Sequence, residues 1–283
     1  MQGGSLRRWL ALLTLCSVAA WPGMPAQASQ TARARAASAP AAAPTASAPT
    51  ITLHLARNGN AVVQVVAGKL LRELYARLGV AIEIEPLPGK RATLMVMAAD
   101  GRLDGEVARV SAYADANPSL IRVDPPYYSL SSSVFVRRGF ATPIRRAEDL
   151  AGLRVGVFGG ATHAELAAKH ALSVVELASF EQLYKMLAAG RVDVVIDAGI
   201  NGDAELRRLG LDALIEHQGD LARLDLHAIL VARHAALAQS LGAEIRALRA
   251  SGELQALTAR YERETLAAWA QAPPPPSASA PSR

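Results

Sequence analysis

Two charged side chains lie at the ends of apolar runs, at points where a buried strand would end. Arg109 follows a Leu/Val-rich run, and Asp197 closes another run just before Gly199. Open α/β sheets place ligand contacts at such strand ends. A guanidinium can hold a planar carboxylate through two parallel hydrogen bonds, so Arg109 is a candidate clamp for an anionic group.

Both residues also have a structural interpretation, and the sequence leaves each alternative open. Arg109 can pair with Glu106, although strand alternation predicts that this acid, three positions away, lies on the opposite face. Asp197 can cap the helix expected after it.

A glycine-rich loop at Gly159 and Gly160 precedes a predicted helix start at Thr162. The free backbone N–H groups of a first helical turn can hold an anion. Thr162 and Glu165 also fit a capping box, in which these two side chains satisfy some of the same N–H groups. Both roles can coexist. The loop lacks the Gly-Lys-Ser/Thr of a nucleotide loop, so the sequence does not support phosphate transfer.

Three further side chains are candidates for ligand contact. Tyr127 follows two prolines and can either stack on a ligand or anchor the edge of a lobe. Arg91 lies at a predicted helix start, where a cation opposes the helix dipole, which indicates either a use elsewhere or simple solvation. His227 is the histidine that we would test for a ligand or pH role.

The sequence lacks the usual patterns of catalysts and metal sites. Its six histidines never show the His-x-x-x-His spacing of a helical metal site, and no Gly-x-Ser-x-Gly elbow occurs. The single cysteine, Cys16, lies near the N-terminus. We therefore expect no metal, no cofactor and no enzymatic activity.

The charge balance excludes a nucleic-acid groove. The 283 residues carry 30 Lys or Arg and 25 Asp or Glu. The excess lies in residues 1–50 and 269–283, which contain five arginines and no acid, so residues 51–268 are formally neutral. A nucleic-acid site needs clustered basic side chains to displace counterions.

The first 28 residues have the features of a secretory signal peptide. Arg7 and Arg8 precede an uncharged run at 9–20, and small residues at 26 and 28 predict cleavage after Ala28. The apolar run is shorter than the roughly 20 residues that a membrane span needs, and a retained anchor is the alternative. The residue before Cys16 is Leu15, which disfavours a lipoprotein signal. We expect export to an oxidising compartment, the periplasm, with no membrane insertion of the mature chain.

Between two Ala/Pro/Ser-rich tails, β-branched runs alternate with helical patterns. This alternation predicts an α/β architecture with parallel sheets and crossover helices. We expect strands at 51–56, 80–87, 103–110, 154–158, 173–177 and 192–197, and helices at 62–78, 91–99, 162–171, 180–189 and 203–209. Apolar stripes at 237–248 and 254–261 predict terminal helices that pack on the first lobe.

An internal echo predicts two lobes of the same winding. The segment 97–104 (MAADGRLD) recurs at 187–193 (LAAGRVD), each time as a helix end, a glycine and a buried strand. We expect chain crossings near 137–140 and 225–231. The predicted organisation is a signal peptide at 1–28, a disordered linker at 29–50, a discontinuous first lobe at 51–137 and 230–268, a second lobe at 138–229 and a disordered tail at 269–283.

These segments resemble the family 3 extracellular solute-binding proteins of bacterial ABC importers. The resemblance covers nearly all of residues 51–265 and is most specific at 148–197, where AEDLAGLRVGVFGGAT and AAGRVDVVIDAG occur in the family's order. It implies a type II periplasmic-binding-protein-like fold, in which two α/β lobes joined by a two-strand hinge close on a small solute, often an amino acid.

The resemblance also implies site residues. In the amino-acid binders, the loop at Gly160 to Thr162 contacts the solute and an acid at Asp197 takes the ammonium group. The Thr-Pro-x-Arg signature is absent from 110–117. The preceding strand instead contains Asp104-Gly105-Glu106, followed a few residues later by Arg109. The usual aromatic residue after the first strand is replaced by a segment that contains Asn58. This departure puts amino-acid specificity in doubt.

We therefore expect an exported, monomeric solute-binding protein that captures a small anionic or zwitterionic molecule and delivers it to an ABC permease. One alternative is a periplasmic enzyme on the same scaffold, of the small-acid dehydratase type, with Glu106 as its acid or base. Another is a sensory or partner-binding module without ligand affinity, whose sign would be a cleft filled by its own side chains.

Overall fold

The computed structural model describes residues 51–98 and 100–272. The predicted signal peptide, the predicted linker at 29–50 and the prolines at 273–276 lie outside this part of the chain. None of the helices within it has the length and apolar character that crossing a bilayer requires.

The first lobe is built on three parallel strands in the order β2-β1-β3. These strands are β1 (Ile51–Asn58), β2 (Val80–Leu87) and β3 (Gly105–Val110). The crossover helices are α1 (Val62–Arg77) and α2 (Gly89–Met97). Ten residues of α1 are buried, because its apolar side chains recur at helical spacing and face the sheet.

The second lobe repeats this arrangement, with three parallel strands in the order β7-β6-β8. They are β6 (Arg154–Phe158), β7 (Ser173–Leu177) and β8 (Val194–Ala198). The crossover helices are α4 (Thr162–Ala167), which continues as a 3₁₀ turn (Ala168–His170), and α5 (Phe180–Ala188). The prediction of two lobes with the same winding is therefore confirmed.

Two aspartates explain why the segment 97–104 recurs at 187–193. Asp104 in the first lobe accepts a hydrogen bond from the backbone N–H of His54, with Oδ2 and N 2.8 Å apart. Asp193 in the second lobe accepts one from the backbone N–H of Arg154 at 2.9 Å. Each aspartate thus ties the start of its strand to the first strand of its own lobe, so the same motif is needed twice.

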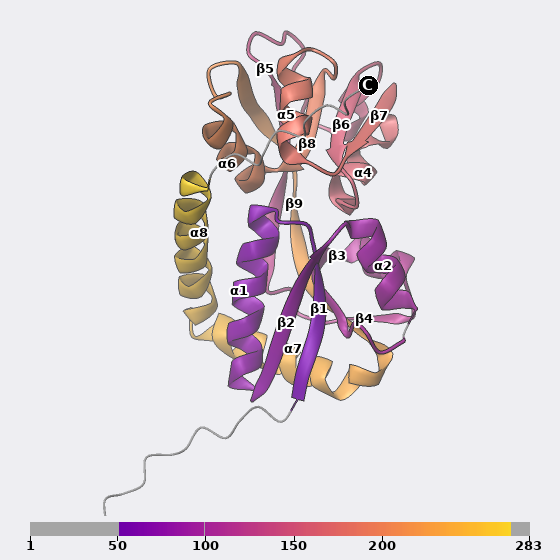
Figure 1. Ribbon diagram of the computed structural model, residues 1–283, viewed down its shortest axis with the longest axis vertical. Coiled ribbons are helices and arrows are strands. Elements are labelled where there is room, and N and C mark those ends of the chain that lie inside the picture. Colours follow the sequence, from indigo (N-terminus) through magenta and orange to yellow (C-terminus); the bar gives the residue numbers. More distant parts are fainter. Residues whose placement is uncertain (1–50, 99, 273–283) are drawn as a thin grey trace, which may run out of the picture. The chain divides into compact units, whose positions relative to one another are not determined.

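Two long antiparallel strands join the lobes: β5 (Tyr128–Arg137) and β9 (Ile215–Val231). β9 also pairs with β3, and β5 also pairs with β8, which makes one continuous sheet (Figure 1). Along β5, Leu130 packs in the core of the first lobe and Val134 in that of the second. Along β9 the same change falls between Leu221 and Leu224.

The crossings therefore lie in the middle of both strands, a few residues before the positions near 137–140 and 225–231 that the sequence predicted. Each hinge strand runs without interruption through both lobes, so no strand end marks the crossing.

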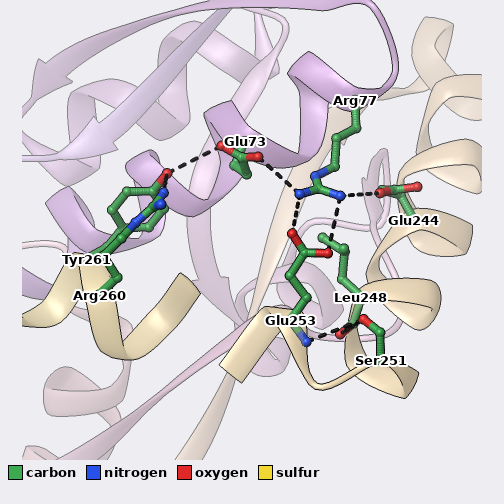
Figure 2. Close-up of polar contacts among 8 residues, drawn as sticks. All are labelled: Glu73, Arg77, Glu244, Leu248, Ser251, Glu253, Arg260 and Tyr261. Atoms are coloured by element: carbon green, nitrogen blue, oxygen red, sulfur yellow. Dashed lines mark hydrogen bonds and ion pairs between the residues drawn. The ribbon is translucent and has the colours of Figure 1, made fainter. Parts of the chain in front are cut away.

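The C-terminal helices cover the first lobe, as predicted. They are α7 (Ala235–Ala250) and α8 (Glu253–Gln271). Leu241, Ile245, Leu254 and Leu257 are buried in the same core as α1. Figure 2 shows the polar rim of this contact, where Arg77 of α1 lies 3.2 Å from Glu73 and 3.9 Å from Glu244 of α7. Such exposed pairs contribute about 0–1 kcal/mol each, so the apolar face holds the helices in place.

The helix α8 extends beyond the predicted start of the disordered tail at residue 269. It ends at Gln271, and the indole Nε1 of Trp269 donates to Glu205 of α6 (Gly199–Leu209) at 3.3 Å. Trp269 also packs on the first-lobe core. This partial burial of Trp269 explains why the helix continues where composition alone predicted disorder.

The remaining elements are short. They are α3 (Ser111–Ala116), β4 (Leu120–Arg122) and the 3₁₀ turns Ala147–Leu150 and Ala232–His234.

Candidate functional site: the inter-lobe cleft

A small cavity of about 40 Å³ lies between the two lobes. β1, α1 and β3 line it from the first lobe. The β6–α4 loop, β8 and α6 line it from the other side. The polar lining residues are Asn58, Gln64, Arg109, Gly160, Thr162, His163, Asp197 and Asn201. Five of the eight side chains or loop positions proposed from the sequence therefore meet at one cavity: Asn58, Arg109, Gly160, Thr162 and Asp197.

The guanidinium of Arg109 is bonded to other residues of the protein. Its Nε donates to Glu106 Oε2 at 2.6 Å, and Nη1 donates to the carbonyl oxygen of Gly160 at 2.9 Å. Nη2 makes an ion pair with Glu106 and reaches the carbonyl of Gly89 at 3.4 Å. The guanidinium also lies 4.6 Å from the ring centre of Tyr113. Of its two sequence interpretations, the structure shows the structural pair.

The expectation that Glu106 and Arg109 lie on opposite strand faces was wrong. β3 shifts register against β9 between these two residues, pairing Glu106 with Ile229 but Arg109 with His227. A β-bulge of this kind changes the direction of the side chains that follow it. Both side chains thereby reach the same buried site, where Glu106 is 1% and Arg109 5% exposed.

The two lobes touch through backbone at Gly89 and Gly160. A Cβ added to Gly160 would lie 2.7 Å from the Gly89 Cα, and one added to Gly89 would lie 2.9 Å from the Gly160 Cα. Gly160 also has a φ of +78°, a conformation that glycine adopts readily. Beside this contact, Lys90 Nζ lies 2.5 Å from Glu176 on β7. The lobes are therefore closed on each other.

The capping box expected at the start of α4 does not form as predicted. The helix begins at Thr162 with Ala161 as its N-cap, and no side chain caps it. Glu165 instead accepts a hydrogen bond from the Gly160 N–H at 2.7 Å. The donor thus lies two residues before the predicted one, the N–H of Thr162. A carboxylate thus occupies a loop N–H and adds negative charge where an anion was expected to bind.

Asp197 lies at the second-lobe wall and is 2% exposed. Its Oδ1 accepts from the Ala198 N–H at 2.7 Å and from Asn201 Nδ2 at 2.9 Å, and Oδ2 accepts from the Tyr184 hydroxyl at 3.2 Å. Burial raises the pKa of this carboxyl group to about 7, and these hydrogen bonds oppose the rise. Asp197 is a buried acid whose hydrogen-bond donors are all neutral.

Asn201 links this acid to the first lobe. Its Oδ1 accepts from the backbone N–H of Val63, in the first turn of α1, at 2.9 Å. The free N–H groups of a first helical turn need such acceptors. Asn201 therefore caps a first-lobe helix while its amide nitrogen holds Asp197.

Two buried acceptors at the cavity have no partner. Gln64 donates through Nε2 to the carbonyl of Ala108 at 3.0 Å, which fixes the orientation of its amide, and its Oε1 is buried without a partner in the described part of the chain. Asn58 Oδ1 is buried and unpartnered in the same way. Burying an acceptor without a donor costs about 1–3 kcal/mol, so a donor that reached either oxygen would stabilise the closed form.

Apolar and neutral side chains complete the wall. Phe158 and Phe180 stack with ring centres 4.1 Å apart, and both line the cavity. His163 donates or accepts at Nδ1 with Ser132 Oγ at 3.0 Å. Burial lowers the pKa of His163 to about 4, so its ring is neutral near pH 7.

Several of these residues were not predicted from the sequence. Gln64 carried a signal, because it is a single polar side chain in the apolar run at 62–67. Asn201 also carried one, because it is a polar residue four positions after Asp197, just beyond the end of the predicted strand. Nothing in the sequence marked Phe158, Phe180 or His163, whose place at the cavity depends on how the lobes meet.

Three proposed residues lie away from the cavity. Tyr127 is buried in the first-lobe core, where its hydroxyl donates to the carbonyl of Val107 at 2.7 Å. His227 is buried between Ser111 and Val123, with contacts of 3.2 and 3.0 Å. Arg91 is exposed on α2. Within residues 51–98 and 100–272, no group of three or more His, Cys, Asp or Glu side chains is arranged to hold a metal ion.

The fold is the two-lobed α/β architecture of type II periplasmic binding proteins. ArgBP of T. maritima, in a mutant crystal structure, is similar with a TM-score of 0.62 and 18% identity, over 74% of this chain and 94% of that one. AbpA of Streptococcus pneumoniae, an amino acid ABC transporter substrate-binding protein bound to L-arginine, gives 0.59 and 18%, over 76% and 96%.

A third similar structure is AncCDT-1, an ancestral amino-acid-binding protein and precursor of cyclohexadienyl dehydratase. It gives a TM-score of 0.59 and 16% identity, over 74% of this chain and 94% of that one. No protein-family model and no curated protein sequence matches the chain. At these identities the structural similarity establishes the fold.

Proposed function

We propose that this protein is a solute-binding protein that captures a small polar molecule between its two lobes. The observation that carries the proposal is the pair of buried, unpartnered oxygens of Gln64 and Asn58 at a cavity that both lobes line. A solute with hydrogen-bond donors would satisfy both. Contacts from both lobes would then favour the closed state over the open one.

The size of the cavity implies that the cleft opens. About 40 Å³ holds roughly three water molecules. A solute of several heavy atoms needs the lobes to stand farther apart, with the two hinge strands absorbing the change in backbone angles. The contacts at Gly89 and Gly160 are the ones that such an opening would break first.

Delivery to an ABC permease is part of the proposal. The resemblance of the sequence to family 3 binding proteins supports it, as does the fold shared with an ABC transporter substrate-binding protein. Transport of this kind would take place in the periplasm, which agrees with the signal-peptide pattern at 1–28. We propose a monomer, with the domain limits expected from the sequence apart from the hinge crossings and the end of α8.

Binding and closure can be measured separately. Thermal unfolding in the presence of a broad panel of polar metabolites should show a rise in melting temperature for one class of solute. Small-angle scattering with that solute should show a change in the radius of gyration. The proposal fails when no member of the panel changes either quantity.

A specific observation favours a second candidate, a sensory or partner-binding module. The cleft is largely filled by the chain's own groups, since Arg109 reaches across it to Gly160 and the remaining space is small. In that case the closed form would be permanent, and the radius of gyration would be the same with and without every solute.

The enzymatic alternative has less support. Glu106 is buried behind Arg109 and bonded to the hydroxyl of Tyr113, and it is not among the described residues that line the cavity. An acid or base must reach the proton that it transfers, and Glu106 does not reach the cleft.

A further inference from the structure

We infer that the cleft selects a small amine, that is, a cation without a carboxylate, over an amino acid or an organic acid. This inference rests on the proposed solute-binding function and names the solute class for the same site. It follows from the charges and hydrogen-bonding groups at the cavity, taken one at a time.

Among the described residues that line the cavity, Arg109 is the only cation, and it is already neutralised. Arg109 is paired with Glu106, and both are more than nine-tenths buried. Its remaining donors reach the carbonyls of Gly160 and Gly89. Among these partners, only Gly160 belongs to the second lobe. When the lobes separate, Glu106, Gly89 and Tyr113 remain, so Arg109 stays neutralised in the open form.

The other place expected to hold an anion is also occupied. The Gly160 N–H is bonded to the Glu165 carboxylate at 2.7 Å. The ring of His163 is neutral near pH 7. A solute carboxylate entering the cavity would thus meet no uncompensated positive charge among the described lining residues, and it would lie near Glu165.

An ammonium group finds the opposite situation. Asp197 is a buried carboxyl group with neutral donors only, and Gln64 Oε1 and Asn58 Oδ1 are buried acceptors without partners. An ammonium carries three donors and no acceptor. The net charge of the cavity, with Arg109 cancelled by Glu106, is that of Asp197. One cation would complete both the charge balance and the hydrogen bonding.

Matched solutes test this inference. The four-carbon series 1,4-diaminobutane, 4-aminobutanoate and succinate differs only in its end groups, as does the two-carbon series ethylamine, glycine and acetate. Calorimetric titration of the full chain at pH 8, where Asp197 is ionised, should show at least tenfold tighter binding of the amine than of the zwitterion in one series, and no binding of the acids.

Variants locate the interaction. Gln64→Leu and Asp197→Asn should each weaken amine binding roughly tenfold or more. Arg91→Ala, an exposed change outside the cavity, should leave it unaltered. Glu106→Gln frees the guanidinium of Arg109 and should add carboxylate binding, visible as a rise in melting temperature with succinate. When Glu106→Gln does not fold, the Gln64 and Asp197 variants still decide.

The outcomes separate this inference from the function on which it rests. A carboxylate-bearing or neutral solute that binds as tightly as the best amine, in these series or in the broad panel, overturns the inference and leaves solute binding intact. Unaltered amine affinity in Gln64→Leu and Asp197→Asn also overturns it. No binding by any solute ends the proposed function itself.

Discussion

The guanidinium of Arg109 in the first lobe donates to the carbonyl oxygen of Gly160 in the second lobe, with Nη1 and O 2.9 Å apart. This bond, the backbone contact between Gly89 and Gly160, and the Lys90–Glu176 pair all form only when the lobes are closed. The closed state is therefore stabilised by the chain itself. A bound solute therefore needs to contribute only the remaining free energy that shifts the equilibrium from open to closed lobes.

The backbone contact gives the sharpest test of closure. Gly160→Ala places a Cβ 2.7 Å from the Gly89 Cα, and backbone cannot move aside as a flexible side chain can. We expect the lobes to be held apart, with a larger radius of gyration in scattering and at least a tenfold loss of solute affinity.

Gly210→Ala is the matched control. Gly210 also has a positive φ, +64°, but an added Cβ would meet nothing within 4 Å. It should cost about 1–2 kcal/mol of folding stability through backbone strain and leave closure unchanged. Equal effects of the two substitutions on the radius of gyration would show that strain, not contact between the lobes, is responsible.

The Lys90–Glu176 pair should contribute little and respond to salt. Both side chains are exposed, by 65% and 42%, and exposed pairs contribute about 0–1 kcal/mol. Lys90→Glu should weaken solute binding by at most about fivefold at low salt, and by less at high salt because of screening. The exchanged double variant Lys90→Glu, Glu176→Lys should recover the original affinity. A large effect that does not depend on salt would contradict this account.

Replacing either aspartate of the repeated segment, Asp104 or Asp193, should lower the stability of the fold. Replacing Asp193 by Ala leaves the Arg154 N–H without its acceptor, and replacing Asp104 does the same to His54. Each loss should cost about 1–3 kcal/mol in urea unfolding. Both carboxylates also bond a guanidinium at 2.7 Å, that of Arg233 for Asp104 and that of Arg154 for Asp193. Asp104→Ala should cost more, because Asp104 has a further contact with His234 Nε2 at 2.6 Å. A neutral result at either position would contradict the equivalence of the lobes.

Those aspartates also show why the fold was predictable. In each lobe, the start of one strand is bonded to the neighbouring strand through an aspartate. The same short segment therefore occurs twice in the sequence. The alternation of strands and helices is local in the same way. The hinge crossings were misplaced because the length of β9 depends on pairing with three other strands, which no local pattern records.

The cleft was predictable only in part, for the same reason. Arg109 and Asp197 lie near the ends of β3 and β8, and Thr162 follows β6, so topology alone brings them together. The role of Arg109 was not predictable, because a register shift in β3 decides that it faces Glu106. Phe158 and Phe180 meet at the cavity only through contact between the lobes. Such features depend on tertiary geometry rather than on spacing along the chain.

The pH dependence of stability should reveal the buried acid at the cleft. Asp197 has a pKa of about 7 in the folded protein and an ordinary value of 3.8, so the folded state holds this proton more tightly. Its contribution to the free energy of unfolding therefore falls as pH rises from about 4 to 7 and is constant above that range. Asp197→Asn removes the titration while keeping the shape of the side chain.

The difference between the native protein and Asp197→Asn isolates this group, because His163 and His217 titrate in both. The Asp197 carboxyl group is faced by Tyr184 of α5 and by Asn201 and Glu205 of α6, and these too are unchanged. In urea unfolding at pH 5, 6, 7 and 8, the native protein should lose stability relative to the variant at each step up to about pH 7. A difference that stays constant across this range would mean that Asp197 is ionised throughout and that its pKa is not raised by burial.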